Sequence, residues 1–150
     1  MTLRSLPRSS SLAFLIFGLL AFAVYGNTPA LAQGMVDLVI RQVEVEPTKA
    51  NGEAWDAFNG KPDLMVTVIS GRKRFTSSVV MNVFEHDFNV KALRVRAGAV
   101  VEIVVADQDI AVDDEIGTLT AVISPADIAK GSVTFSGFGR VKQLVVEFRK

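Results

Sequence analysis

Hydrophobic and polar residues alternate along most of the chain beyond residue 34. Between Met35 and Val45 apolar side chains recur at every second position, and a period of two is typical of a β-strand with one buried face. Short apolar runs separated by Gly, Pro and Asn turn residues continue to the C-terminus. The expected strands cover residues 35–45, 64–70, 75–83, 84–95, 100–105, 119–123 and 144–148.

These runs predict an all-β domain. Polar residues at 85–87 divide one run, so we count about eight short strands joined by turns, which is typical of an antiparallel β-sandwich. The run from Val100 to Val105 is apolar on both faces and predicts a central strand. One segment, Pro125 to Lys130, favours a short helix.

The first 32 residues have the pattern of a secretory signal peptide. Basic residues precede an apolar run from Leu12 to Val24, and the small residues Ala30 and Ala32 follow it. The apolar run is short for a transmembrane helix. We therefore predict cleavage after Ala32, a mature domain of residues 33–150 and a secreted or periplasmic location, with a retained membrane anchor as the alternative.

Composition limits the classes of function. The chain has 16 Lys and Arg residues against 16 Asp and Glu residues, and so balanced a charge argues against a nucleic-acid partner. There is no cysteine, which excludes both a disulfide framework and a thiolate metal site. Residues 33–150 have the length of one ordinary domain with its own core.

Two acidic segments lie between the expected strands, and both are candidates for metal binding. Clustered carboxylates repel one another unless a cation lies among them, and a long loop in a small domain is usually functional. For either segment alone, ordinary solvated turn residues are the alternative interpretation. Residues 48–63 contribute Asp56 and Asp63, and residues 106–117 contribute Asp107, Asp109, Asp113 and Asp114.

Calcium is the cation that these residues favour. If both segments lie at one end of a sandwich, their carboxylates converge, and Ca²⁺ accepts six to eight oxygen ligands in flexible geometry. Magnesium demands a stricter octahedron and is the poorer match. The spacing is not that of an EF-hand, because Val112 and Thr118 stand where such a loop starting at Asp107 requires glycine and glutamate.

The two acidic segments resemble the calcium-binding loops of a C2 domain. The relevant residues are Trp-Asp-Ala-Phe-Asn-Gly-Lys-Pro-Asp at 55–63, Val-Val-Ala-Asp-Gln-Asp at 104–109 and Asp-Asp-Glu-Ile-Gly at 113–117. The resemblance covers nearly all of residues 33–150. It implies an eight-stranded antiparallel β-sandwich with Greek-key connections, Ca²⁺ as cofactor and calcium-dependent docking to anionic phospholipid. The metal ligands it implies are Asp56, Asp63, Asp107, Asp109 and either Asp113 or Asp114.

The chain departs from the family pattern in the first loop. Leu64 and Met65 replace the usual Pro-Tyr, and the gap between Asp56 and Asp63 is one residue longer than in common family members. These departures change the loop geometry without removing a carboxylate. In the second loop, Asp114 has the family spacing to Gly117, and Asp113 is its rival as a ligand.

Three apolar residues in these segments are candidates for membrane contact. Ile110 and Val112 lie in a polar loop with little opportunity for burial, and Phe58 lies in the first acidic segment. Core or loop packing is the alternative for Phe58, as it is for Trp55. A basic patch of Lys91, Arg94 and Arg96 is either a solvated face or a site for lipid headgroups.

The sequence does not predict an enzyme. The single histidine, His86, is flanked by Glu85 and Asp87, and the motifs of common hydrolases and nucleotide-binding enzymes are absent. We predict a calcium-binding module that docks to an anionic phospholipid membrane or to an acidic partner. The alternative is an extracytoplasmic domain that calcium stabilises and that binds a protein partner without lipid.

Overall fold

A computed structural model describes residues 34–56, 60–109 and 112–150. All of them belong to one compact unit, residues 31–150. The predicted signal peptide lies outside the described residues, so cleavage after Ala32 stays a prediction. Within the described ranges, no helix is both long and apolar enough to cross a bilayer.

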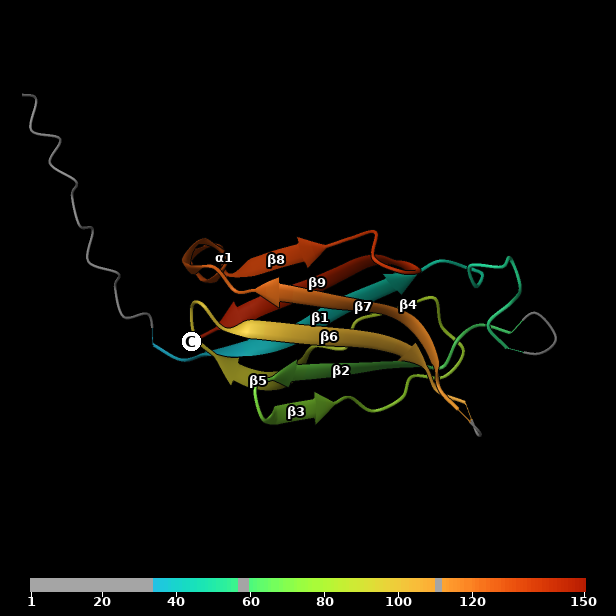
Figure 1. The fold of residues 1–150 in the computed structure, drawn as a ribbon, viewed down its shortest axis with the longest axis horizontal. Helices are drawn as coiled ribbons and strands as arrows, with labels where there is room; N and C mark the ends of the chain where they lie inside the picture. The colour runs from blue at the N-terminus through green and yellow to red at the C-terminus, as the bar shows by residue number, and fades with distance from the viewer. Residues whose placement is uncertain (1–33, 57–59, 110–111) are drawn as a thin grey trace, which may run out of the picture. The chain divides into compact units, whose positions relative to one another are not determined.

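The described strands form two antiparallel sheets that face each other (Figure 1). The first sheet contains β4 (Glu85–His86), β1 (Val36–Val45), β9 (Val141–Arg149) and β8 (Ser132–Phe135) in this order, with β5 (Val90–Val95) also paired to β1. The second contains β3 (Lys73–Thr76), β2 (Leu64–Ser70), β6 (Val100–Asp107) and β7 (Asp114–Val122). This arrangement confirms the predicted antiparallel β-sandwich. Because β4 and β5 both pair with β1, they share one position in the first sheet.

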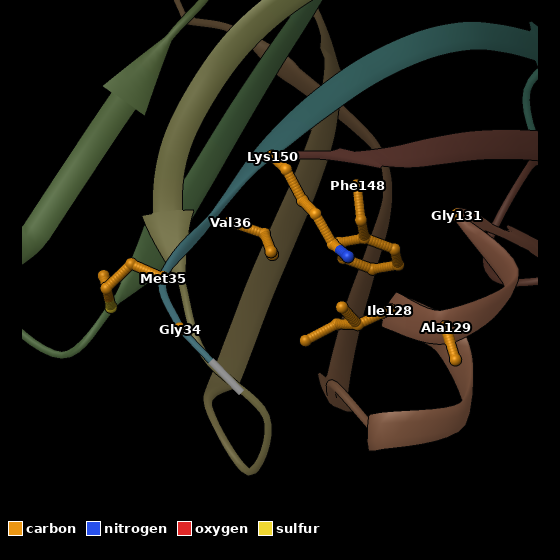
Figure 2. A pocket seen from close by; sticks show the side chains of 8 residues that line it. All are labelled: Gly34, Met35, Val36, Ile128, Ala129, Gly131, Phe148 and Lys150. Carbon is orange, nitrogen blue, oxygen red and sulfur yellow. The ribbon is translucent and has the colours of Figure 1, made fainter. Parts of the chain in front are cut away.

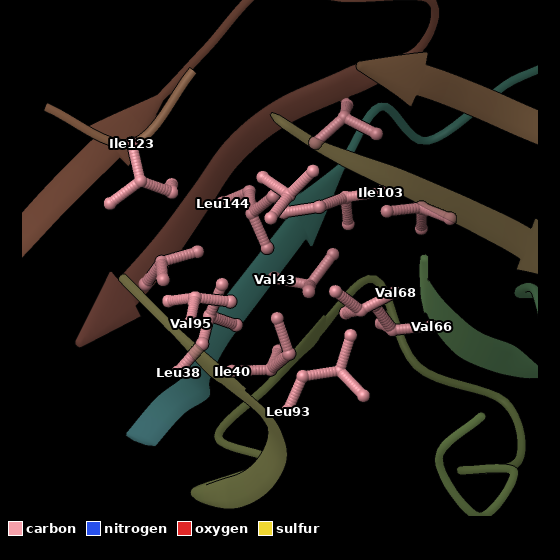
Figure 3. Close-up of a cluster of buried hydrophobic side chains, with 14 of the residues drawn as sticks. Leu38, Ile40, Val43, Val66, Val68, Leu93, Val95, Ile103, Ile123 and Leu144 are labelled. Carbon is pink, nitrogen blue, oxygen red and sulfur yellow. The ribbon is translucent and has the colours of Figure 1, made fainter. Parts of the chain in front are cut away.

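The core lies between the two sheets and consists mainly of branched aliphatic side chains (Figure 3). Each contributing strand presents alternate residues to it, as period-two patterning requires. β6 is an interior strand of its sheet, paired with β2 on one side and with β7 on the other, as its apolar sequence predicted. Fully buried members include Leu38, Ile40, Val43, Leu64, Val66, Val68, Ile103 and Leu144.

A β-bulge in β1 explains why the residues that face the core switch from even to odd numbers along the strand. Ile40 pairs with Val146 and Gln42 with Val145, so Arg41 is an extra residue on β1. An extra residue reverses the faces of all later positions. The β1 residues that belong to the core between the sheets are therefore even-numbered up to Ile40 and odd-numbered from Val43.

Several predicted strand boundaries were wrong. The strand expected at 75–83 ends at Thr76, because the Ser77 hydroxyl, rather than a carbonyl, accepts the Val66 N–H at 3.0 Å. The strand expected at 119–123 begins earlier, at Asp114, because backbone pairing with β6 continues through polar residues. β8 was missed, since four residues are too few for a periodic pattern.

The predicted helix is confirmed as α1 (Pro125–Lys130). Ser124 caps its N-terminus: its side chain accepts the Asp127 N–H, and the Asp127 carboxylate accepts the Ser124 N–H in return. This reciprocal pair satisfies two backbone donors that a short helix would otherwise leave open. Gly131 ends the helix in the left-handed region, at φ 81°.

Candidate functional site

The two acidic segments meet at the end of the sandwich opposite α1 (Figure 1). The Gln108 N–H donates to the Asp63 carbonyl at 2.9 Å, which joins the segments directly. In the strand ladders, Leu64 lies opposite Asp107, and Asp107 lies opposite Asp114. Asp63, Asp107 and Asp114 therefore stand at the ends of three adjacent strands, β2, β6 and β7.

Asp107 is the most unusual residue at this end. It closes β6 and has 0% exposed surface. Its Oδ1 accepts the Asp63 backbone N–H at 2.6 Å, whereas its buried Oδ2 has no hydrogen-bond partner among the residues that the structure describes. Buried polar atoms without a partner are rare and are costly, more so when they carry charge. Among the described residues, Oδ2 of Asp107 therefore has no hydrogen-bond donor.

Burial and the neighbouring carboxylates raise the pKa values of two aspartates at this end. The pKa of Asp107 is raised to about 6, chiefly by loss of hydration and also by the nearby charges of Asp56, Asp109 and Asp63, while the hydrogen bond from the Asp63 N–H opposes the shift. Desolvation also raises the pKa of Asp56, with further contributions from Asp63 and Asp109. The charges of Asp63 and Asp109 thus act on the ionisation of both Asp107 and Asp56.

The other predicted ligands make local contacts. The Asp63 carboxylate accepts the Asn82 N–H at 2.7 Å, which orients it from the strand connection beyond β3. The Asp113 carboxylate accepts the Asp109 N–H at 3.3 Å, so Asp113 closes the turn between β6 and β7. This contact occupies one oxygen of Asp113.

Lys49 is the site residue that sequence reasoning missed. It lies in the first acidic segment and forms a salt bridge and hydrogen bond with the Asp114 carboxylate. That hydrogen bond raises the pKa of Lys49, against the opposing effect of burial, and the charges of Asp114, Asp109 and Asp107 raise it further. No pattern in the sequence links Lys49 to Asp114, because 65 positions separate them.

The donor set matches calcium in kind. Carboxylate oxygens from two loops are what Ca²⁺ prefers, and the partnerless Oδ2 of Asp107 is an oxygen that a cation would satisfy. Their side chains are not gathered around one point, however. In the ranges that the structure describes, no three His, Cys, Asp or Glu residues are grouped so as to hold a metal ion.

The predicted membrane-contact residues are only partly described. Phe58 and Ile110 lie outside the described residues. Val112 is 76% exposed, so this apolar side chain at the acidic end is not buried against the described residues. Trp55, by contrast, belongs to the core, and its indole N–H donates to the Glu46 carbonyl at 2.8 Å.

The predicted basic patch is partly neutralised by one carboxylate. Lys91 and Arg94 both form salt bridges with Asp37, at 2.8 Å and 3.4 Å. Arg94 also donates to the Met35 carbonyl at 3.0 Å. Arg94 lies in β5 and Arg96 directly follows the end of that strand, and both residues are exposed.

Two hollows accompany these features. A cavity of about 760 Å³ lies at the α1 end, where Val36, Ile128 and Phe148 face the same space beside Lys150 (Figure 2). Its described lining contains no acidic, imidazole or hydroxyl side chain. The second, a groove of about 370 Å³, lies at the acidic end, with Lys49, Asp114 and Arg140 in its lining.

The fold and its acidic end define a C2-like β-sandwich. No family model and no curated protein matches the sequence. Among solved structures, the chain is similar to one described as a C2 domain, with a TM-score of 0.56 at 15% identity over 78% of this chain and 100% of that one. It is also similar to a single C2 domain of plant extended synaptotagmin 1, with a TM-score of 0.55 at 14% identity over 79% of this chain and 95% of that one.

Two longer proteins show the same fold over part of their length. The calcium-bound pair of C2 domains of extended-synaptotagmin 2 matches with a TM-score of 0.51 at 19% identity, over 79% of this chain and 46% of that one. Human GIVD cytosolic phospholipase A2 matches with a TM-score of 0.58 at 16% identity, over 77% of this chain and 16% of its own. The chain thus spans less than half of each. At these identities the likeness establishes the fold, and ligands must be argued from the residues of this chain.

Proposed function

We propose that this protein is a calcium-binding docking module of the C2 type that works outside the cytoplasm and has no catalytic activity. The acidic end binds Ca²⁺ and, through it, an anionic phospholipid surface or an acidic partner. The structural likeness to C2 domains supports the fold on which this proposal rests. The residues of the acidic end support the ligand.

Oδ2 of Asp107, which is buried and has no hydrogen-bond partner among the described residues, is the observation that carries the proposal. A buried carboxylate oxygen without a donor destabilises a fold, and the same strand end could hold an amide or an apolar residue if only structure mattered. Placing this oxygen beside Asp63, Asp56 and Asp109 increases the cost, as the raised pKa of Asp107 reflects. A divalent cation among these groups removes both the missing contact and the repulsion.

The chain supplies the ligands from both segments. Asp56, Asp63, Asp107 and Asp109 would hold the ion, with Asp114 as the fifth carboxylate and Asp113 as its rival. Bound calcium supplies open coordination positions that accept phosphate or carboxylate oxygens. Small side-chain rotations at loop positions are required to bring the carboxylates together. Asp107, held by β6 and by the Asp63 N–H, is the fixed point of the set.

Exposed apolar residues favour docking to a lipid surface. Val112 is 76% exposed beside the carboxylates, where it can enter an apolar layer once the local negative charge is neutralised. Phe58 and Ile110 are assigned the same role from the sequence. This combination of metal and apolar contact favours a membrane over a purely polar partner.

A second candidate is a domain that calcium stiffens and that binds a protein without lipid. The basic patch favours this alternative, because Asp37 holds both Lys91 and Arg94 and so reduces the positive charge available to headgroups. Arg96 alone is a weak attraction, since each basic residue near an anionic surface contributes about 1 kcal/mol.

Vesicle sedimentation separates the two candidates. Vesicles of phosphatidylserine and phosphatidylcholine are mixed with the protein in chelator or in about 1 to 5 mM calcium, which is at or above the dissociation constants of extracellular calcium modules. Calcium-dependent sedimentation that needs phosphatidylserine supports lipid docking. Binding of calcium in solution without sedimentation removes the lipid role and leaves the stiffened interaction domain. Neutral vesicles serve as the control for apolar association.

A further inference from the structure

Lys49 places a positive charge inside the acidic end. Its ammonium is bonded to the Asp114 carboxylate, and the two side chains are 27% and 45% exposed. The ammonium also lies 5.9 Å from the centre of the Trp55 ring, a buried core residue that limits where the lysine stem can go. The pair is therefore a positioned contact at the site rather than a freely solvated one.

The position of Asp114 makes this contact relevant to metal binding. Asp114 lies directly opposite Asp107 in the β6–β7 ladder, so the lysine is bound to the strand end that pairs with Asp107. The same ammonium interacts electrostatically with Asp109 and Asp107. Among the described residues, no salt bridge joins any other cation to the predicted ligands.

A metal ion and this ammonium cannot both use Asp114 without conflict. Two cations at one carboxylate repel, and a divalent ion placed among the aspartates favours displacement of the lysine. Space for the displaced side chain exists, because Lys49 and Asp114 line the same groove of about 370 Å³. Movement within this groove requires no change in the strands.

We infer that Lys49 is a displaceable counter-ion of the candidate calcium site, which neutralises Asp114 in the metal-free protein and must release it when calcium binds. The inference rests on the proposed function. It makes Lys49 a residue that sets the calcium affinity of the site without being a ligand. Because the Lys49–Asp114 contact must break when calcium binds, the free energy of that contact weakens the observed calcium affinity by the same amount.

Calorimetric calcium titrations of the full chain test this inference. Lys49→Met removes the ammonium and keeps the stem, Lys49→Arg keeps the charge, and Lys61→Met is the matched control. Lys61 lies in the same segment but stacks over the Phe84 ring at 5.4 Å instead of pairing with a carboxylate. We expect Lys49→Met to bind calcium more tightly than wild type by about two- to fivefold, the fold-change that corresponds to one partly exposed ion pair.

The control variants separate a specific contact from general electrostatics. Lys49→Arg should retain wild-type affinity, and Lys61→Met should gain less than Lys49→Met. In an Asp114→Asn background the gain from Lys49→Met should disappear, because the competing carboxylate is gone. Thermal melts add a second readout: Lys49→Met should lower the melting temperature in chelator and match wild type in saturating calcium.

Each result of the titrations decides one of the two claims. Wild-type binding with no gain in Lys49→Met, or an equal gain in Lys61→Met, overturns the counter-ion role and leaves the proposed function standing. No calcium binding by wild type together with binding by Lys49→Met supports the counter-ion role and rejects the function for the native chain. If neither protein binds calcium, both claims fail.

Discussion

The two ends of the sandwich each contain an aspartate, and the hydrogen bonding of these two carboxylates differs. At the helix end, the Asp127 carboxylate accepts both the Ser124 N–H and the Ser124 hydroxyl, and these bonds lower the pKa of Asp127. At the acidic end, Asp107 accepts one backbone N–H, leaves one buried oxygen unpartnered among the described residues and has a pKa raised to about 6. One carboxylate stabilises the fold, and the other opposes it.

This contrast separates structure from function within one domain. A carboxylate that terminates a helix needs only backbone donors, and the chain provides them within three residues. Asp107 is held in place by the backbone N–H of Asp63, yet its second oxygen has no donor in the part of the chain that the structure describes. Proteins retain such destabilising groups where a ligand completes them, so the difference between the two ends identifies the acidic end as the candidate binding region.

The largest expected effect is the change in the free energy of unfolding when calcium is added or removed. Calcium at one hundred times its dissociation constant should stabilise wild type by about 2.7 kcal/mol, because only the folded chain brings the two segments together. Changing Asp107 and Asp109 together to Asn should abolish this shift. Metal-free stability should be unchanged or slightly higher, since amides relieve the repulsion. Denaturant unfolding in calcium and in chelator measures both quantities.

Glu115 is the control for that experiment. It adjoins Asp114 and is exposed, but it is not among the predicted ligands. Glu115→Gln should leave the calcium shift nearly intact. Equal losses from Glu115→Gln and from the Asp107/Asp109 pair would mean that general acidity, and not a defined site, attracts the metal.

The next effect concerns the apolar residue at the acidic end. Val112→Ser should weaken calcium-dependent binding to phosphatidylserine vesicles by about tenfold, which corresponds to losing the burial of one aliphatic side chain. The melting temperature should not change, because Val112 is already 76% exposed. Sedimentation and thermal melts on the same sample check both expectations. Unchanged partitioning would remove Val112 from the docking surface.

The stability of the metal-free protein should depend on pH, because the Asp107 carboxylate is buried. Asp107 binds its proton more tightly in the folded chain than in the unfolded one, with a pKa of about 6 against 3.8. The metal-free protein should therefore gain stability as pH falls through 6, by about 1 kcal/mol between pH 7 and pH 5. The gain should be absent in Asp107→Asn. Calcium affinity should fall over the same interval, because protonation removes a ligand.

The smallest effect tests the helix end. Asp127→Ala removes the acceptor for the Ser124 N–H and should destabilise the fold by about 1 kcal/mol. The loss should be the same in calcium and in chelator, because α1 lies at the opposite end from the carboxylates. A calcium-dependent difference would show that the two ends are coupled. Chemical denaturation under both conditions measures the change.

Patterning predicted the architecture better than the contacts. Alternating apolar residues predicted most of the strands, and the strand ends placed Asp63 and Asp107 together because each follows or precedes a buried run. The bulge at Arg41 and the strand β8 escaped prediction, since both depend on pairing with distant residues. Backbone pairing also carries β7 through Asp114 and Glu115, which the sequence suggested were loop residues.

At the candidate site, too, the sequence predicted the residue types but not their contacts. Acidic spacing identified the carboxylates, because their repulsion is visible in the sequence itself. Neither the Lys49–Asp114 pair nor the unpaired Oδ2 of Asp107 was predictable, because each depends on which side chains the fold brings together across the β6–β7 strand ends. Charge content alone cannot distinguish an aspartate that is satisfied from one that lacks a partner.

A calorimetric titration of the full chain with calcium, in parallel with Asp107→Asn, tests the central claim most directly. The claim predicts saturable binding by wild type with a dissociation constant on the order of 0.1 to 1 mM, as in extracellular calcium modules. It predicts no measurable binding by Asp107→Asn, whose amide still accepts the Asp63 N–H but offers the metal no carboxylate. Wild type that releases no binding heat, or an Asp107→Asn variant that binds as tightly as wild type, would contradict the claim that the unpaired oxygen of Asp107 is a calcium ligand.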